Sequence, residues 1–181
     1  MSLSALKNHL TTAVTVASLA GIAAFALVPG SSSGRASAPQ KMSLSAQDST
    51  VGATAVAASP TPDGNGFWVA WSNGMVTTSG DAISYGNVSG VHLAAPVVGM
   101  ASTPDGKGYW LLGADGGVFS FGDAGFHGST GATHLNKPAL QMVSSGDGNG
   151  YDFVAGDGGV FNFGDAPFYG STGNVRLAQP V

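Results

Sequence analysis

Short apolar runs separated by polar, glycine-rich turns define the pattern of this chain. In its middle part, apolar runs at 97–102 and 109–112 are followed by alternating polar and apolar positions over 118–121. Runs of this length between turn residues predict β-strands. Asp-Gly pairs at 105–106 and 115–116 supply the residues that tight hairpins prefer. The pattern therefore predicts an antiparallel meander.

A fourth strand is predicted at 126–130, before a longer connection at 131–138. The whole arrangement recurs every 42 residues, so that three units (56–97, 98–139 and 140–181) align without a gap. Turn residues mark the period: Asp63, Asp105 and Asp147, and the triplets that begin at Gly80, Gly122 and Gly164. An internal repeat of four short strands predicts an all-β domain of β-propeller-type blades. The alternative is a β-trefoil, which also has three repeats of this kind.

Three blades leave open edges. Closed propellers have about 4–8 blades, and unpaired strands and faces favour association. We therefore expect a homo-oligomer, in which a head-to-tail pair of chains closes a ring of six blades.

The outer units depart from the middle one. Unit 1 has Thr77 and Ser79 where unit 2 has Phe119 and Phe121, which is typical of a terminal, capping repeat. Unit 3 has Asp152 at the position that tryptophan occupies in the other two units. This substitution makes unit 3 the least regular copy.

The N-terminal segment carries a targeting pattern. Lys7 and His9 precede an uncharged stretch from 10 to 28 that is rich in Ala, Val and Leu. We expect residues 1–38 to be a signal peptide or, when uncleaved, a hydrophobic helix that anchors the chain in a membrane. Residues 39–55 lack periodicity and are expected to form a flexible linker. The predicted location is secreted or at the cell surface, with membrane contact only through the N-terminal segment.

Composition removes several classes of function. The net charge is −4 and the chain has only six Lys plus Arg, so it lacks the basic face that a nucleic-acid partner requires. Cysteine is absent, which excludes disulfides and thiolate chemistry.

The repeat itself resembles one in known proteins. Gly108-Tyr109-Trp110-Leu111-Leu112, followed by the sequence DGGVFSFGDA at 115–124, is similar to a tandem repeat of exported actinobacterial proteins. The resemblance covers roughly residues 56 to 181. It implies a propeller-like fold outside the cytoplasm and implies no particular activity.

Candidate binding residues follow the period. His92, His134 and Arg176 occupy one repeat position in the long connections, so in a symmetric domain they lie on one rim and form an anion or sugar site. No carboxylate adjoins the two histidines, so a zinc site is not expected. Trp68 and Trp110 offer stacking surfaces for sugar rings or partner side chains, or they pack between blades.

Other motifs favour structural roles. The stretch 147–152 faintly resembles a calcium loop, but Asp-Gly and Asn-Gly are ordinary hairpin residues. Ser129 lies near His127, yet no neighbouring residue orients that imidazole as a base. We expect no catalytic residues, no cofactor and no metal site.

The sequence therefore predicts an exported, non-catalytic binding or scaffold module that contacts a protein or a cell-envelope glycan. Two alternatives stay open: an incomplete propeller portion of a larger exported hydrolase or lyase, and a trefoil-type lectin.

Overall fold

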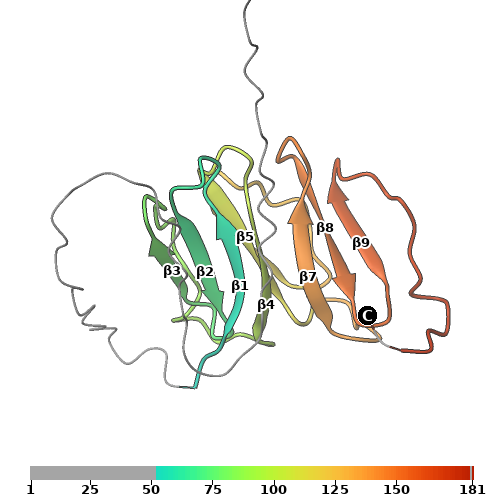
Figure 1. The fold of residues 1–181 in the computed structure, drawn as a ribbon. Coiled ribbons are helices and arrows are strands. Elements are labelled where there is room, and N and C mark those ends of the chain that lie inside the picture. Colours follow the sequence, from blue (N-terminus) through green and yellow to red (C-terminus); the bar gives the residue numbers. More distant parts are fainter. Residues whose placement is uncertain (1–51, 180) are drawn as a thin grey trace, which may run out of the picture. The chain divides into compact units, whose positions relative to one another are not determined.

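The structure, a computed structural model, describes residues 52–179 and residue 181. These residues form nine strands in three separate antiparallel sheets, one for each repeat (Figure 1). Sheet 1 contains β1 (Ala55–Pro60), β2 (Phe67–Trp71) and β3 (Val76–Ser79); sheet 2 contains β4 (Val97–Ser102), β5 (Gly108–Gly113) and β6 (Val118–Gly122); sheet 3 contains β7 (Ala139–Ser144), β8 (Gly150–Ala155) and β9 (Val160–Gly164). The all-β repeat architecture is thus confirmed.

Each sheet is a meander in which the middle strand pairs with both neighbours. In sheet 2, Leu111 lies opposite Met100 on one side and Phe119 on the other. The link between β5 and β6 contains the predicted Asp-Gly pair, and Gly116 has a φ of 79°, a conformation that suits glycine. The hairpins expected from the turn residues are therefore present.

Successive sheets stack face to face. Neighbouring residues of one strand point to opposite faces of the sheet, so the middle sheet contributes side chains to both interfaces. In β5, Tyr109 and Leu111 join the core shared with sheet 1, whereas Trp110 and Leu112 join the core shared with sheet 3. All four side chains are fully buried. We call the face towards the preceding sheet proximal and the face towards the following sheet distal. Burial of each such side chain contributes about 1.5–3 kcal/mol, so the two cores hold the stack together.

The predicted fourth strand is absent from the described part of the chain, so that prediction is wrong. Each third strand is followed by an irregular stretch, which we call connection 1 (83–96), connection 2 (125–138) and connection 3 (167–179). In connection 2, the Thr130 amide donates to the Gly116 carbonyl at 3.0 Å, and the His127 amide donates to the Tyr151 hydroxyl at 3.2 Å. These backbone groups bond to a hairpin and to the next sheet, and so do not form a ladder with β6.

A glycine explains why the stretch is not a strand. Gly128 has a φ of 130°, which side-chain-bearing residues rarely adopt, and a Cβ there would lie 2.7 Å from the Phe163 ring. Connection 2 therefore bends at Gly128 to cross the aromatic surface of sheet 3.

Several predictions concern the N-terminal part. The signal or anchor segment 1–38, its hydrophobic helix and residues 39–51 of the linker lie outside the described residues. The linker residues 52–55 are described, and the last of them, Ala55, begins β1. Within residues 52–179 and at 181, no helix capable of crossing a membrane is found.

Candidate functional site

Two grooves recur one repeat apart at the end of the sheets where β5 and β8 finish. Groove A, of about 470 Å³, lies between connection 2 and the hairpin that links β5 to β6. Its polar lining includes Asp115, Thr133, His134, Asn136 and Lys137, and Ala94 of connection 1 closes one side.

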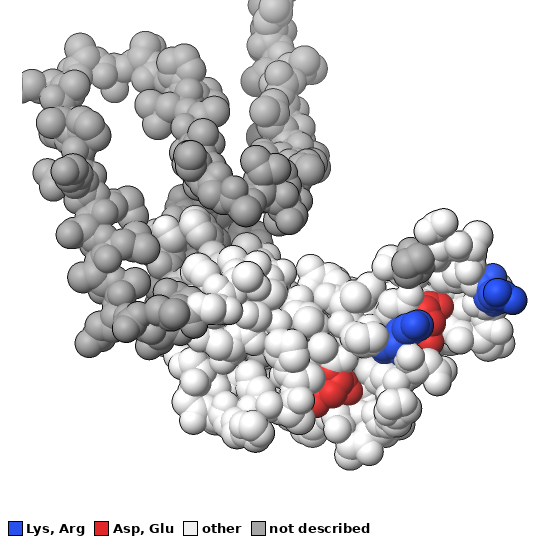
Figure 2. Space-filling model, turned by 90° about the horizontal axis from the view of Figure 1, so that it is seen from below, with Lys and Arg blue, Asp and Glu red and all other residues white. Residues whose placement is uncertain are grey.

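Groove B, of about 370 Å³, lies at the equivalent place of sheet 3. Asp157 stands where groove A has Asp115, and Arg176 stands where it has His134. Lys137 lines both grooves. Figure 2 views this end of the molecule and shows few charged side chains on it, with an acidic and a basic group side by side at one place.

Backbone hydrogen bonds fix the walls of the grooves. The Ala114 amide donates to the Pro96 carbonyl at 2.9 Å, and the Gly156 amide donates to Pro138 at the same distance. On the other wall, connection 2 crosses the hairpin so closely that a Cβ on Gly116 would lie 1.9 Å from the Thr130 hydroxyl. Glycine is required at this crossing.

The carboxylates are oriented by their own turns. One oxygen of Asp115 accepts from the Gly117 amide at 3.0 Å, and Asp157 accepts from Gly159 at 3.0 Å. His134, Lys137 and Arg176 are exposed. Each groove thus presents a positioned carboxylate beside nitrogen donors, a set that hydrogen-bonds to hydroxyl groups and to anions.

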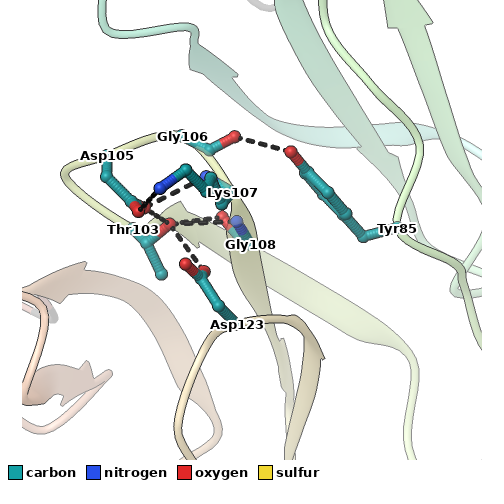
Figure 3. A network of polar contacts seen from close by, with 7 residues as sticks. All are labelled: Tyr85, Thr103, Asp105, Gly106, Lys107, Gly108 and Asp123. Carbon is teal, nitrogen blue, oxygen red and sulfur yellow. Dashed lines mark hydrogen bonds and ion pairs between the residues drawn. The ribbon is translucent and has the colours of Figure 1, made fainter.

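The opposite end of the sheets carries a second polar arrangement (Figure 3). The Thr103 hydroxyl donates to Asp105 at 2.9 Å and accepts from the Gly108 amide at 3.0 Å, while Asp123 lies 3.3 Å from the same hydroxyl. Lys107 forms an exposed ion pair with Asp105 at 3.1 Å. These contacts close the turn between β4 and β5.

The same turn recurs in the other sheets with Thr61 and Asp63, and with Ser145 and Asp147. The Thr61 hydroxyl and the Asn65 amide hold the pKa of Asp63 at about 2, below its ordinary value of 3.8. The Lys107 amide and the Thr103 hydroxyl likewise hold the pKa of Asp105 at about 2. Hydrogen bonds to the ionised form favour it, so these aspartates are ionised turn residues.

A hollow of about 290 Å³ separates the turns of sheets 2 and 3 and is lined by Asp105, Asp123 and Asp147. Among the described residues, no group of three or more His, Cys, Asp or Glu side chains is arranged to hold a metal ion. The stretch 147–152, which faintly resembles a calcium loop, lies in the turn of sheet 3 and the start of β8, where Asp147 accepts from the Asn149 amide at 3.1 Å.

Comparisons with known proteins add little. No protein-family model matches the chain, and no curated protein matches it. A solved structure of hydrazine synthase from Kuenenia stuttgartiensis is similar over 61% of this chain, with 14% sequence identity and a TM-score of 0.43. The matched part spans 32% of that protein's chain, about a third of its length. A likeness at this level carries no argument about function.

The structure separates the five predicted site residues. His134 and Arg176 line grooves A and B at equivalent places. His92 is exposed in connection 1 and lines neither groove. The Trp68 and Trp110 side chains are buried, with 1% and 0% of their surface exposed, so neither ring is open to a ligand. Their indole nitrogens donate to backbone carbonyls, at 2.7 Å in each case.

Sequence reasoning missed three groove residues, Asp115, Asp157 and Lys137. Both aspartates belong to Asp-Gly pairs, and the sequence analysis interpreted the pair at 115–116 as a hairpin signal alone. Their recurrence 42 residues apart, in register with His134 and Arg176, is the signal that could have grouped them.

Proposed function

We propose that this domain is a non-catalytic binding module of an exported protein, and that its ligand is a cell-envelope glycan lying across grooves A and B. The observation that carries the proposal is the recurrence of one donor–acceptor set in successive repeats, with Lys137 shared between them. A polymer of sugar units presents hydroxyl and anionic groups at regular intervals, and a repeated site suits such a ligand.

The chemistry of the two grooves differs in one respect. Groove B carries Arg176, whose planar guanidinium binds carboxylate or phosphate in a bidentate manner, whereas groove A carries His134. Both grooves combine these groups with an exposed lysine and a carboxylate. Charge-assisted hydrogen bonds are about twice as strong as neutral ones, so an anionic glycan is favoured over a neutral one.

The fold assignment belongs to the same proposal. We take the three sheets to be propeller-type blades, because each repeat forms its own meander and the meanders stack face to face. The first strands pack in sequence, β1 beside β4 and β4 beside β7. This arrangement supports blades over a trefoil.

Calorimetric titration with a neutral glucan and with a uronate-containing polysaccharide tests the proposal. Lys137→Ala removes a donor from both grooves and is expected to weaken binding of the anionic polysaccharide about tenfold. Lys107→Ala is the matched control, because this lysine is also exposed but lies at the opposite end of the sheets.

Equal affinities of the two lysine variants, or no binding of either polysaccharide, would contradict the proposal. Loss of binding in Lys137→Ala together with a smaller loss in His134→Ala, which changes groove A alone, would support it.

A further inference from the structure

The same type of contact is present at both interfaces between sheets, once between sheets 1 and 2 and once between sheets 2 and 3. The Tyr109 hydroxyl accepts from the Tyr85 amide at 3.2 Å and donates to the Gly86 carbonyl at 2.6 Å. One hydroxyl of sheet 2 thus satisfies two backbone groups of connection 1.

The contact recurs one repeat later with the same geometry. The Tyr151 hydroxyl accepts from the His127 amide at 3.2 Å and donates to the Gly128 carbonyl at 2.6 Å. The glycines allow the close approach, since a Cβ on Gly86 would lie 3.0 Å from the Phe121 ring, and Gly128 meets Phe163 in the same way. At each interface, the following sheet therefore supplies a tyrosine from its second strand and a phenylalanine from its third strand.

On sheet 3 the receiving half of this contact has no partner among the described residues. Tyr169 occupies the position of Tyr85 and His127 but is 91% exposed. Gly170 has a φ of 123°, close to the 125° of Gly86 and the 130° of Gly128, and no atom of residues 52–179 or 181 lies within 4 Å of its Cβ position. Connection 3 therefore has the backbone conformation that connections 1 and 2 have at a formed interface. Its Tyr169 ring, Tyr169 amide and Gly170 carbonyl are available for contact.

The surrounding surface is apolar. A hollow of about 290 Å³ on sheet 3 is lined by Val143, Val154 and Val160 together with Gln141 and Asp152. Val143 is 60% exposed, although the equivalent Ala101 of sheet 2 is buried against sheet 3. The distal face of sheet 3 thus continues the pattern of the two formed interfaces.

We propose that this distal face is a docking surface for a further sheet of the same kind of repeat. The occupant is a sheet whose second strand carries tyrosine at the position of Tyr109 and Tyr151, and whose third strand carries phenylalanine at the position of Phe121 and Phe163. Its tyrosine hydroxyl bonds to the Tyr169 amide and to the Gly170 carbonyl.

A second copy of this chain does not offer that occupant. Its open proximal face is that of sheet 1, where Phe67 replaces the tyrosine and lacks the hydroxyl. Thr77 and Ser79 replace the two phenylalanines, and both are exposed. The docked sheet therefore differs from the partner in the ring of two identical chains, which stays a prediction from the sequence.

One substitution sets the strength of the docked interface. Asp152 replaces the tryptophan of the inner sheets and accepts from the Asn162 amide group, which also donates to the Pro167 carbonyl at 3.2 Å. In sheet 2 the equivalent carbonyl, on Gly125, accepts from Trp110. The Pro167 carbonyl thus has a hydrogen-bond donor without an indole ring. Because the distal face of sheet 3 lacks that buried ring, the docked sheet is held more weakly than sheets 2 and 3 hold each other.

The full chain can be made to supply the occupant. The variant Phe67→Tyr/Thr77→Phe/Ser79→Phe gives sheet 1 the proximal face of an inner sheet. Light scattering coupled to size exclusion is expected to show a monomer for the natural chain and head-to-tail association for the triple variant. Adding Tyr169→Ala, which removes an exposed ring, is expected to restore the monomer.

Two outcomes would overturn the proposal: a triple variant that folds, as judged by circular dichroism, yet stays monomeric, and association that persists after Tyr169→Ala. Association of the natural chain that Tyr169→Ala abolishes would equally overturn it, because Phe67 would then suffice.

A second measurement avoids the added surface phenylalanines. A copy of residues 98–139 fused after residue 181 places an inner sheet beside the distal face. Hydrogen exchange at the Tyr169 amide is expected to slow at least tenfold relative to the same fusion with phenylalanine in place of the added tyrosine. Equal exchange rates in the two fusions would overturn the proposal.

Discussion

The Tyr151 hydroxyl donates a 2.6 Å hydrogen bond to the Gly128 carbonyl across the interface between sheets 2 and 3. The same oxygen accepts from the His127 amide. The tyrosine ring is fully buried, so water does not readily replace either bond. Irregular connection 2 is thereby tied to sheet 3 by a side chain in place of a strand ladder.

Tyr151→Phe is expected to destabilise the domain by about 1–3 kcal/mol, because it leaves a carbonyl and an amide without their partner in a partly buried place. Urea unfolding followed by circular dichroism measures the change. Tyr169→Phe is the control and should leave the free energy of unfolding unchanged, since Tyr169 is 91% exposed. Similar losses in the two variants would contradict this account.

His127→Tyr is expected to stabilise the domain by about 1 kcal/mol. The Nε2 atom of His127 is buried and has no hydrogen-bond partner among the described residues. At the equivalent place, the Tyr85 hydroxyl reaches across the interface and donates to the Gly106 carbonyl at 3.0 Å. A tyrosine at 127 gains the corresponding bond to Gly148.

Thermal unfolding checks this prediction. His127→Phe is the control, because it supplies the same six-membered ring as tyrosine without the hydroxyl. A higher melting temperature for tyrosine than for phenylalanine supports the hydrogen bond. Equal melting temperatures would show that packing alone matters.

Trp110→Ala is expected to destabilise the domain by about 3–5 kcal/mol, because it removes a fully buried ring. The centroid of that ring lies 5.4 Å from the centroid of the Tyr151 ring. Chemical denaturation measures the loss. A variant of unchanged stability that lost ligand binding would instead assign Trp110 to the binding surface.

Acid is expected to weaken the turns at the other end of the sheets. The folded pKa of Asp63 and Asp105 is about 2, below the ordinary 3.8, so their hydrogen bonds stabilise the fold above about pH 4. This stability is lost as the pH falls from about 4 towards 2, when the carboxylates become protonated.

The free energy of unfolding, measured between about pH 5 and pH 2, checks the direction. The double variant Asp63→Asn/Asp105→Asn keeps acceptor oxygens in both turns and is expected to show a shallower loss in acid. An identical acid profile in the variant and the natural chain would refute the assignment.

The sequence pattern was sufficient for the strands and hairpins, since apolar runs and Asp-Gly pairs are local signals. It failed at 126–130, where the run looks like a strand. There the decisive interactions involve residues remote in sequence. The Tyr151 hydroxyl donates to the Gly128 carbonyl, and the Phe163 ring packs against Gly128. Residue spacing predicts equivalent positions for His134 and Arg176, but the walls of the grooves depend on how the connections cross the hairpins.

Leu111 and Leu112 are adjacent in β5, yet they contribute to different cores. The domain consequently has no common centre whose loss would melt everything together. Each sheet depends only on its immediate neighbours, so we expect unfolding to start at the outer sheets and to move inward one interface at a time. Such an array tolerates the gain of a repeat by duplication or its loss by deletion, because the tyrosine contact between sheets recurs at both formed interfaces.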